Sequence, residues 1–124
     1  MIIKNETVLI IDYGSQYTQL IARKIREQNV YCLVYPYNKI YSKILNNANI
    51  SGIILSGGPN SVKDKRSPKF DKKILKLKVP ILGICYGLQL ICKEFNGKIG
   101  QSSSREYGHS KIIKKNKSII LNDV

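Results

Sequence analysis

Long apolar runs are absent from this 124-residue sequence. No stretch approaches the roughly 18 consecutive apolar residues of a membrane-spanning helix, so we expect no membrane association. The first six residues are not followed by the long apolar segment and small-residue cleavage site of a signal peptide. The three cysteines are odd in number and lack metal-ligand spacing. They predict reduced thiols, no bound metal and a cytoplasmic location.

Acidic residues are also scarce: eight Asp and Glu stand against 21 Lys and Arg, which gives a formal net charge of +13. Such an excess suggests nucleic-acid binding, because Lys and Arg neutralise phosphates. The two densest basic tracts, residues 63–78 and 111–117, show neither the aromatic interleaving of a stacking platform nor a zinc-finger or helix-turn-helix signature. We therefore expect no nucleic-acid partner, and we interpret the charge as a solvated surface that favours anionic ligands or an acidic partner.

The length and the composition suit one globular domain, since 43% of the residues are hydrophobic and no linker or repeat divides the chain. Four short apolar runs predict buried strands, each followed by a helix-like pattern. We expect strands at residues 7–12, 30–35, 52–56 and 79–84, and helices at 16–28, 39–46, 67–76 and 86–95. Further strand-like pieces lie near 98–99, 110–114 and 118–121. This alternation predicts an α/β fold: an open, mostly parallel, doubly wound sheet that helices cover on both faces.

Individual side chains in these elements have expected roles. Ser15 and Ser67 are placed to begin helices. Periodicity predicts that the inward-facing residues are Leu20, Ile21 and Ile25 in the first helix, Ile40, Ile44 and Leu45 in the second, and Leu88, Ile91, Cys92 and Phe95 in the last. Cys32, within a predicted strand, and Cys92 are expected in the core.

Three motifs follow predicted strands, at the sheet edge where functional groups of parallel sheets gather. They are Asp-Tyr-Gly-Ser-Gln at 12–16, Ser-Gly-Gly-Pro at 56–59 and Gly-Ile-Cys-Tyr-Gly at 83–87. The last has the form of a nucleophile elbow, with Gly83 and Gly87 allowing the sharp turn around Cys85. The N-terminus of the following helix would stabilise a Cys85 thiolate. A buried structural thiol and, at Gly-Gly-Pro, a plain turn are the alternatives.

Acyl transfer also needs donors for the oxyanion of a tetrahedral intermediate. A backbone N–H of the loop at Gly57 and Gly58, together with the N–H of Tyr86 just after the cysteine, could supply them.

The motifs occur in order along nearly the whole chain, with Arg-Glu-Tyr-Gly at 105–108 as a fourth. Together they resemble the class I (triad) glutamine amidotransferases, whose fold is flavodoxin-like, and the tract at 12–27 is similar to the GMP synthetase branch. The elbow is shared with the anthranilate, carbamoyl phosphate and CTP branches, so a different branch stays an alternative. The resemblance implies a glutaminase that cleaves glutamine through a Cys85 thioester. Gly58 and Tyr86 would bind the oxyanion, and Gln89 and Gly57 would bind the substrate.

The resemblance also implies a partner. The ATP-pyrophosphatase module, which converts XMP to GMP in this family, is not in the sequence, so we expect it as another domain or subunit. ATP and Mg would bind there, and no cofactor is expected in this domain. The family's catalytic His-x-Glu motif would follow Val124, which implies a domain incomplete at its C-terminus, with exposed apolar faces. His109, the only histidine, precedes that position and is expected to be an ordinary residue. The chain alone should be a poor glutaminase, or else a binding or regulatory module without turnover.

Overall fold

The structure, a computed structural model, describes residues 6–47, 49–100 and 110–123. Four parallel strands form one sheet in the order β2-β1-β3-β4. The strands are β1 Thr7–Asp12, β2 Tyr31–Pro36, β3 Ile50–Leu55 and β4 Ile81–Gly83. The α-helices are α1 Thr18–Glu27, α2 Ser42–Asn47 and α3 Tyr86–Glu94, and two 3₁₀ segments are η1 Tyr37–Lys39 and η2 Lys72–Leu77. The predicted open parallel sheet of an α/β fold is confirmed.

The register of the sheet brings the ends of three strands together. Ile11 of β1 lies opposite Leu55 of β3, and Leu55 lies opposite Gly83 of β4. Because the strands are parallel, the three motifs that follow them leave the sheet at the same edge.

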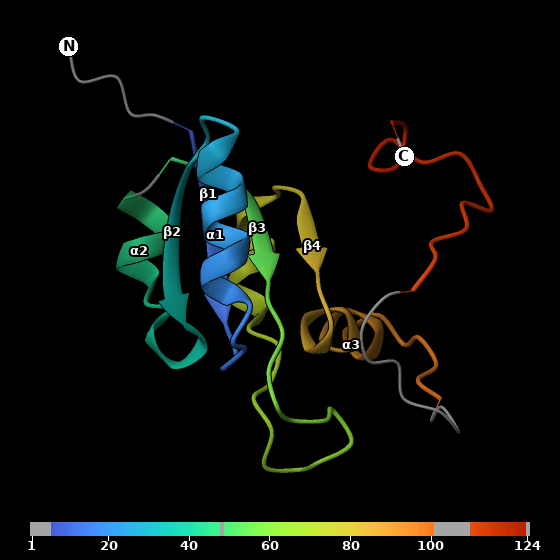
Figure 1. Cartoon of the computed structure of the whole chain (residues 1–124). Helices are drawn as coiled ribbons and strands as arrows, with labels where there is room; N and C mark the ends of the chain where they lie inside the picture. Colours follow the sequence, from blue (N-terminus) through green and yellow to red (C-terminus); the bar gives the residue numbers. More distant parts are fainter. Residues whose placement is uncertain (1–5, 48, 101–109, 124) are drawn as a thin grey trace.

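Alternating side chains divide the core between the two faces of the sheet. On one face Ile10 and Cys32 pack with Ala22 of α1, which crosses that face in Figure 1. On the other face a larger cluster joins strand residues to α2, η2 and α3, and its buried members are Leu9, Ile11, Tyr13, Ile40, Leu45, Ile50, Ile53, Leu55, Val62, Ile74, Tyr86 and Leu90. The prediction of cover on both faces is confirmed.

The predicted helix at 67–76 is wrong, because only η2 within this stretch is helical, and it is a 3₁₀ helix. The hydroxyl of Tyr86 donates to the carbonyl of Pro68. That carbonyl would have to accept a backbone N–H four residues on if an α-helix began at Ser67. Ser67 instead hydrogen-bonds back into the preceding turn, and Asp71 caps η2 by accepting a backbone N–H.

The first helix, α1, also begins later than the predicted start at residue 16. Ser15 does not cap it; its Oγ accepts the N–H of Tyr17 at 3.0 Å in a turn, and α1 starts at Thr18. Leu20, predicted to face inward, is 48% exposed, while Ala22 is fully buried. Leu20 and Ala22 are two positions apart on a helix of about 3.6 residues per turn, so they point to opposite sides, and the side with Ala22 meets the sheet.

The predicted inward face of α3 is correct at Ile91, which packs against the larger cluster, and wrong at Leu88 and Phe95. Leu88 and Phe95 are 58% and 62% exposed, and Leu90 is the buried leucine of this helix. Gly87 of α3 lies against the backbone of Leu55, so the side of the helix that carries Gly87 and Leu90 faces the sheet. Cys32 is buried as predicted, but Cys92 is only half-buried.

The strands predicted after α3 are absent from the described residues there. Residues 98–99, 110–114 and 118–121 are irregular or in turns, and Figure 1 shows the segment 110–123, in red, away from the sheet. Among the described residues the sheet consists of β1 to β4, and the segment after α3 adds no strand to it. Residues 105–108 and His109 lie outside the described residues. Among the described residues, none of the helices is long and apolar enough to cross a membrane.

Candidate active site

Cys85 occupies the turn between β4 and α3 in a backbone conformation that side chains rarely adopt. Its φ is 53° and its ψ is −116°, and its side chain is exposed. Such a conformation is strained for any residue except glycine, and it tends to occur at functional sites. The turn presents the thiol at the N-terminus of α3, where partial positive charge stabilises an anion.

Gly83 and Gly87 make this turn possible because each lies against backbone. A Cβ added at Gly83 would lie 2.7 Å from the carbonyl oxygen of Gly87, and a Cβ added at Gly87 would lie 2.2 Å from the carbonyl oxygen of Leu55. These distances are far below van der Waals contact. The geometry is that of a nucleophile elbow, in which strand, turn and helix are compressed around one exposed side chain.

A cavity of about 380 Å³ opens beside the thiol. Its lining combines residues of the three motifs at the sheet edge with Tyr17, and the full set is Gly14, Ser15, Gln16, Tyr17, Gly57, Gly58, Pro59 and Cys85. The structure therefore brings Cys85 together with Gly57 and Gly58, the two loop glycines that the sequence analysis selected.

Buried hydrogen bonds hold the two loops of this cavity together. The hydroxyl of Thr18 donates to Oδ1 of Asp12 at 2.9 Å and lies 3.0 Å from the Oγ of Ser56, which has no exposed surface. Asp12 also accepts the N–H of Gly14 at 2.8 Å. The start of α1 is thus tied to the residue before Gly57, which fixes the loops relative to each other.

The remaining predicted residues lie on α3. Tyr86 is its first residue, so its N–H has no acceptor within the helix. The side chain of Tyr86 is buried and points away from solvent. Gln89 is half-buried one turn after Cys85, and its N–H donates to the Cys85 carbonyl at 3.2 Å. Gln89 is not among the residues that line the cavity, so its predicted role in binding substrate stays a prediction.

Five lining residues were not selected from the sequence as site residues: Gly14, Ser15, Gln16, Tyr17 and Pro59. Their signal was position, since Gly14, Ser15, Gln16 and Pro59 belong to motifs that follow β1 or β3, and Tyr17 comes directly after the first motif. The described lining contains no His, Asp or Glu, so no conventional acid-base partner of Cys85 is found in this part of the chain. Among the described residues there is also no group of three His, Cys, Asp or Glu side chains that could hold a metal.

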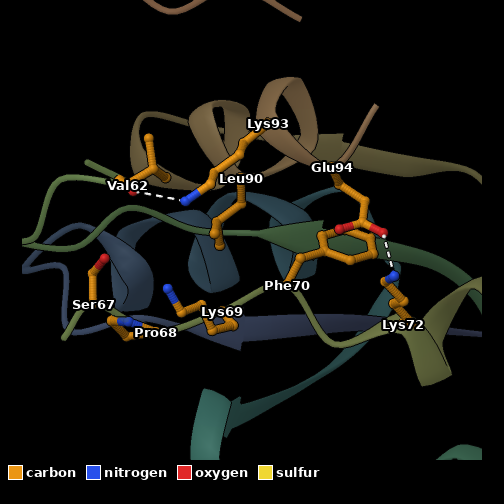
Figure 2. Close-up of a pocket in the computed structure, with 9 residues that line it drawn as sticks. All are labelled: Val62, Ser67, Pro68, Lys69, Phe70, Lys72, Leu90, Lys93 and Glu94. Carbon is orange, nitrogen blue, oxygen red and sulfur yellow. Dashed lines mark hydrogen bonds and ion pairs between the residues drawn. The ribbon is translucent and has the colours of Figure 1, made fainter. Parts of the chain in front are cut away.

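A second cavity of about 300 Å³ lies between α3 and the irregular segment before η2. Figure 2 shows Phe70 and Leu90 inside it and several lysines around it. Two of these lysines already have partners, because Lys72 pairs with Glu94 at 3.6 Å and Lys93 donates to the Val62 carbonyl at 3.1 Å. Cys85 is not among the residues that line this second cavity.

The family model for glutamine amidotransferase class-I matches residues 9–123. The chain belongs to this family. The resemblance to the class I glutamine amidotransferases that the sequence motifs indicated is confirmed. The GMP synthase [glutamine-hydrolyzing] of Borreliella burgdorferi strain N40 is 50% identical over 120 residues, which cover 96% of this chain. That of Caldanaerobacter subterraneus subsp. tengcongensis is 51% identical over 111 residues, which cover 90%.

This amidotransferase chain spans 23% and 22% of the lengths of those two relatives. Among solved structures, a Thermoplasma acidophilum protein, provisionally assigned as one of the subunits of GMP synthase, matches with a TM-score of 0.61 and 27% identity. The match covers 84% of this amidotransferase chain and 52% of the Thermoplasma protein.

Proposed function

We propose that this amidotransferase domain hydrolyses glutamine and supplies ammonia for the conversion of XMP to GMP. The observation that carries the proposal is the placement of Cys85: an exposed thiol, held at φ 53° at the N-terminus of α3, opens into a cavity lined by Gly57 and Gly58. Relatives named GMP synthase [glutamine-hydrolyzing], which are 50% and 51% identical to this chain, support the GMP synthetase branch of the family.

The proposed reaction begins with attack of the Cys85 sulfur on the carboxamide carbon of glutamine. The backbone N–H groups of Gly58 and Tyr86 bind the oxyanion, while Gln89 and Gly57 bind the substrate. The carbon-nitrogen bond then breaks, and ammonia leaves with the proton that the Cys85 thiol gave up on attack. Water attacks the glutamyl thioester, releases glutamate and returns the thiol. The proton donor for ammonia is not among the described residues that line the cavity.

The proposed partner is an ATP-pyrophosphatase domain or subunit that binds ATP and Mg and uses the ammonia. No cofactor is proposed for the amidotransferase domain itself, no nucleic acid is proposed as a partner, and the proposed location is the cytoplasm. The net charge of +13 would favour an acidic surface on the partner.

A second candidate is a binding or regulatory module that holds glutamine or the synthetase partner without turnover. The absence of His, Asp and Glu from the described cavity lining favours it. The two candidates differ in chemistry at Cys85, because only the first needs a thioester.

Ammonia release from glutamine tests the proposal in the natural protein that carries this chain, with and without its synthetase partner. We expect activity that Cys85→Ala abolishes and that Cys92→Ala preserves, since Cys92 is half-buried outside the cavity. Glutamine-dependent ammonia release that survives Cys85→Ala would contradict the proposed nucleophile. Glutamine binding without any ammonia release would establish the second candidate instead.

A further inference from the structure

We propose that Tyr13 is a positioning residue that fixes both oxyanion donors, an inference that rests on the proposed function. Tyr13 follows the last residue of β1, is 4% exposed and does not line the cavity beside Cys85. It contacts Gly58 with its main chain and Tyr86 with its ring. One residue thus touches the two separate segments from which the donors come.

The main-chain contact sets the position of Gly58. A Cβ added at Gly58 would lie 2.3 Å from the carbonyl oxygen of Tyr13 and 3.0 Å from its Cβ. The Cα of Gly58 is therefore seated directly on the Tyr13 backbone, and a displacement of Tyr13 would carry the Gly58 N–H with it.

The ring contact sets the position of Tyr86. The two ring centroids lie 5.4 Å apart at an interplanar angle of 62°, which is the edge-to-face geometry that aromatic pairs prefer. Tyr86 is 2% exposed and is the first residue of α3, directly after Cys85. Packing against Tyr13 therefore acts on the helical turn that presents both the thiol and the second N–H.

Two further contacts hold this aromatic pair in place. Tyr37 of η1 stacks on the Tyr13 ring with centroids 5.7 Å apart and planes 14° from parallel. The Tyr86 hydroxyl donates to the carbonyl of Pro68. The pair is held from both sides, so removal of the Tyr13 ring would open space that Tyr86 could enter.

Selective inactivation separates positioning from simple core packing. The probe is a chloromethyl ketone analogue of glutamine, whose carbonyl forms a tetrahedral adduct that needs the oxyanion donors. Iodoacetamide alkylates the same thiol without that adduct. For Tyr13→Leu in the natural protein we expect ketone inactivation to slow about 10-fold or more, because small misplacements of reacting groups are costly. Alkylation by iodoacetamide should change by less than about 2-fold, since the thiol itself stays exposed.

Two control variants complete the test. Tyr13→Phe keeps the ring and should retain the wild-type ratio of the two inactivation rates. Ile10→Ala removes a buried side chain from the cluster on the opposite face and should lower stability without changing that ratio. The positioning role would be overturned if the ratio of the two inactivation rates were unchanged in Tyr13→Leu, or if it fell equally in Ile10→Ala. Either result would leave the proposed function intact. A different result would overturn the proposed function, and this inference with it: glutamine that fails to protect Cys85 of the wild-type protein from the ketone.

Discussion

Gly57 and Cys85 face each other so closely that a Cβ added at Gly57 would lie 3.2 Å from the Cβ of Cys85. The same atom would lie 3.5 Å from both the Cβ and the Oγ of Ser15. Position 57 therefore borders the thiol and the opposite cavity wall at once. The absence of a side chain there leaves room for a planar group to approach the sulfur.

Gly57→Ala should impair chemistry at Cys85 more than it impairs folding. The added methyl group crowds the approach to the thiol, and we expect kcat/KM for glutamine hydrolysis to fall about 10- to 100-fold. Unfolding free energy should change by less than about 1 kcal/mol, because the neighbours can move by a few tenths of an ångström. Steady-state kinetics and urea titration measure the two effects. Gly100→Ala is the control, since a Cβ there meets nothing within 4 Å; equal kinetics in the two variants would contradict the crowding.

Gly87→Ala should destabilise the fold itself. Its Cβ would lie 2.2 Å from a backbone oxygen of Leu55, so α3 and β3 would have to separate. We expect a loss of about 3 kcal/mol in unfolding free energy, at the upper end of overpacking effects. Gly52→Ala in the same strand as Leu55 is the matched control, because its nearest contact, with the carbonyl oxygen of Pro80, is 3.8 Å. Denaturant unfolding of both variants checks this, and a loss at Gly87 no larger than that at Gly52 would rule out the predicted close approach.

The sheet and the thiol could be predicted from the sequence because both depend on local signals. The β-branched run at 7–12 is buried on both faces, so its apolar continuity marks β1 with the correct bounds. Gly83 and Gly87 mark the elbow through their local spacing around Cys85, and Gly83 lies against the backbone of Gly87, only four residues away.

The errors arise where distant contacts override local patterns. Pro68 looks like the start of a helix, but its carbonyl is taken by Tyr86, 18 residues later. In α3, Gly87 lies against the backbone of Leu55 in β3, which places Gly87 and Leu90 toward the sheet and leaves Leu88 exposed. The cavity wall at 14–17 depends on the register that places β1 beside β3, which no single segment encodes.

Alkaline pH should destabilise the folded protein through Tyr13. Burial, reinforced by the nearby Tyr86 and Asp71, raises the pKa of the Tyr13 hydroxyl above its ordinary value. Above about pH 10 the unfolded chain therefore loses this proton first, and unfolding free energy falls by up to about 1.4 kcal/mol per pH unit. Below that pH the contribution is fully present and constant. Urea unfolding of Tyr13→Phe should show a shallower alkaline slope than wild type. Identical slopes in wild type and Tyr13→Phe would exclude this linkage.

Cys85→Gly should stabilise the protein while abolishing glutamine hydrolysis. The φ of 53° with a ψ of −116° costs a residue with a Cβ about 1 to 3 kcal/mol, a cost that glycine avoids. The greater freedom of glycine in the unfolded chain offsets about 0.5 to 1 kcal/mol of this. We expect a net gain of about 1 kcal/mol in unfolding free energy, measured by urea titration. Cys85→Ala removes the same sulfur but keeps the Cβ, so it should lose hydrolysis without that gain. If the glycine variant is no more stable than the alanine variant, the turn stores no strain, and the exposed thiol is held there at no cost to the fold.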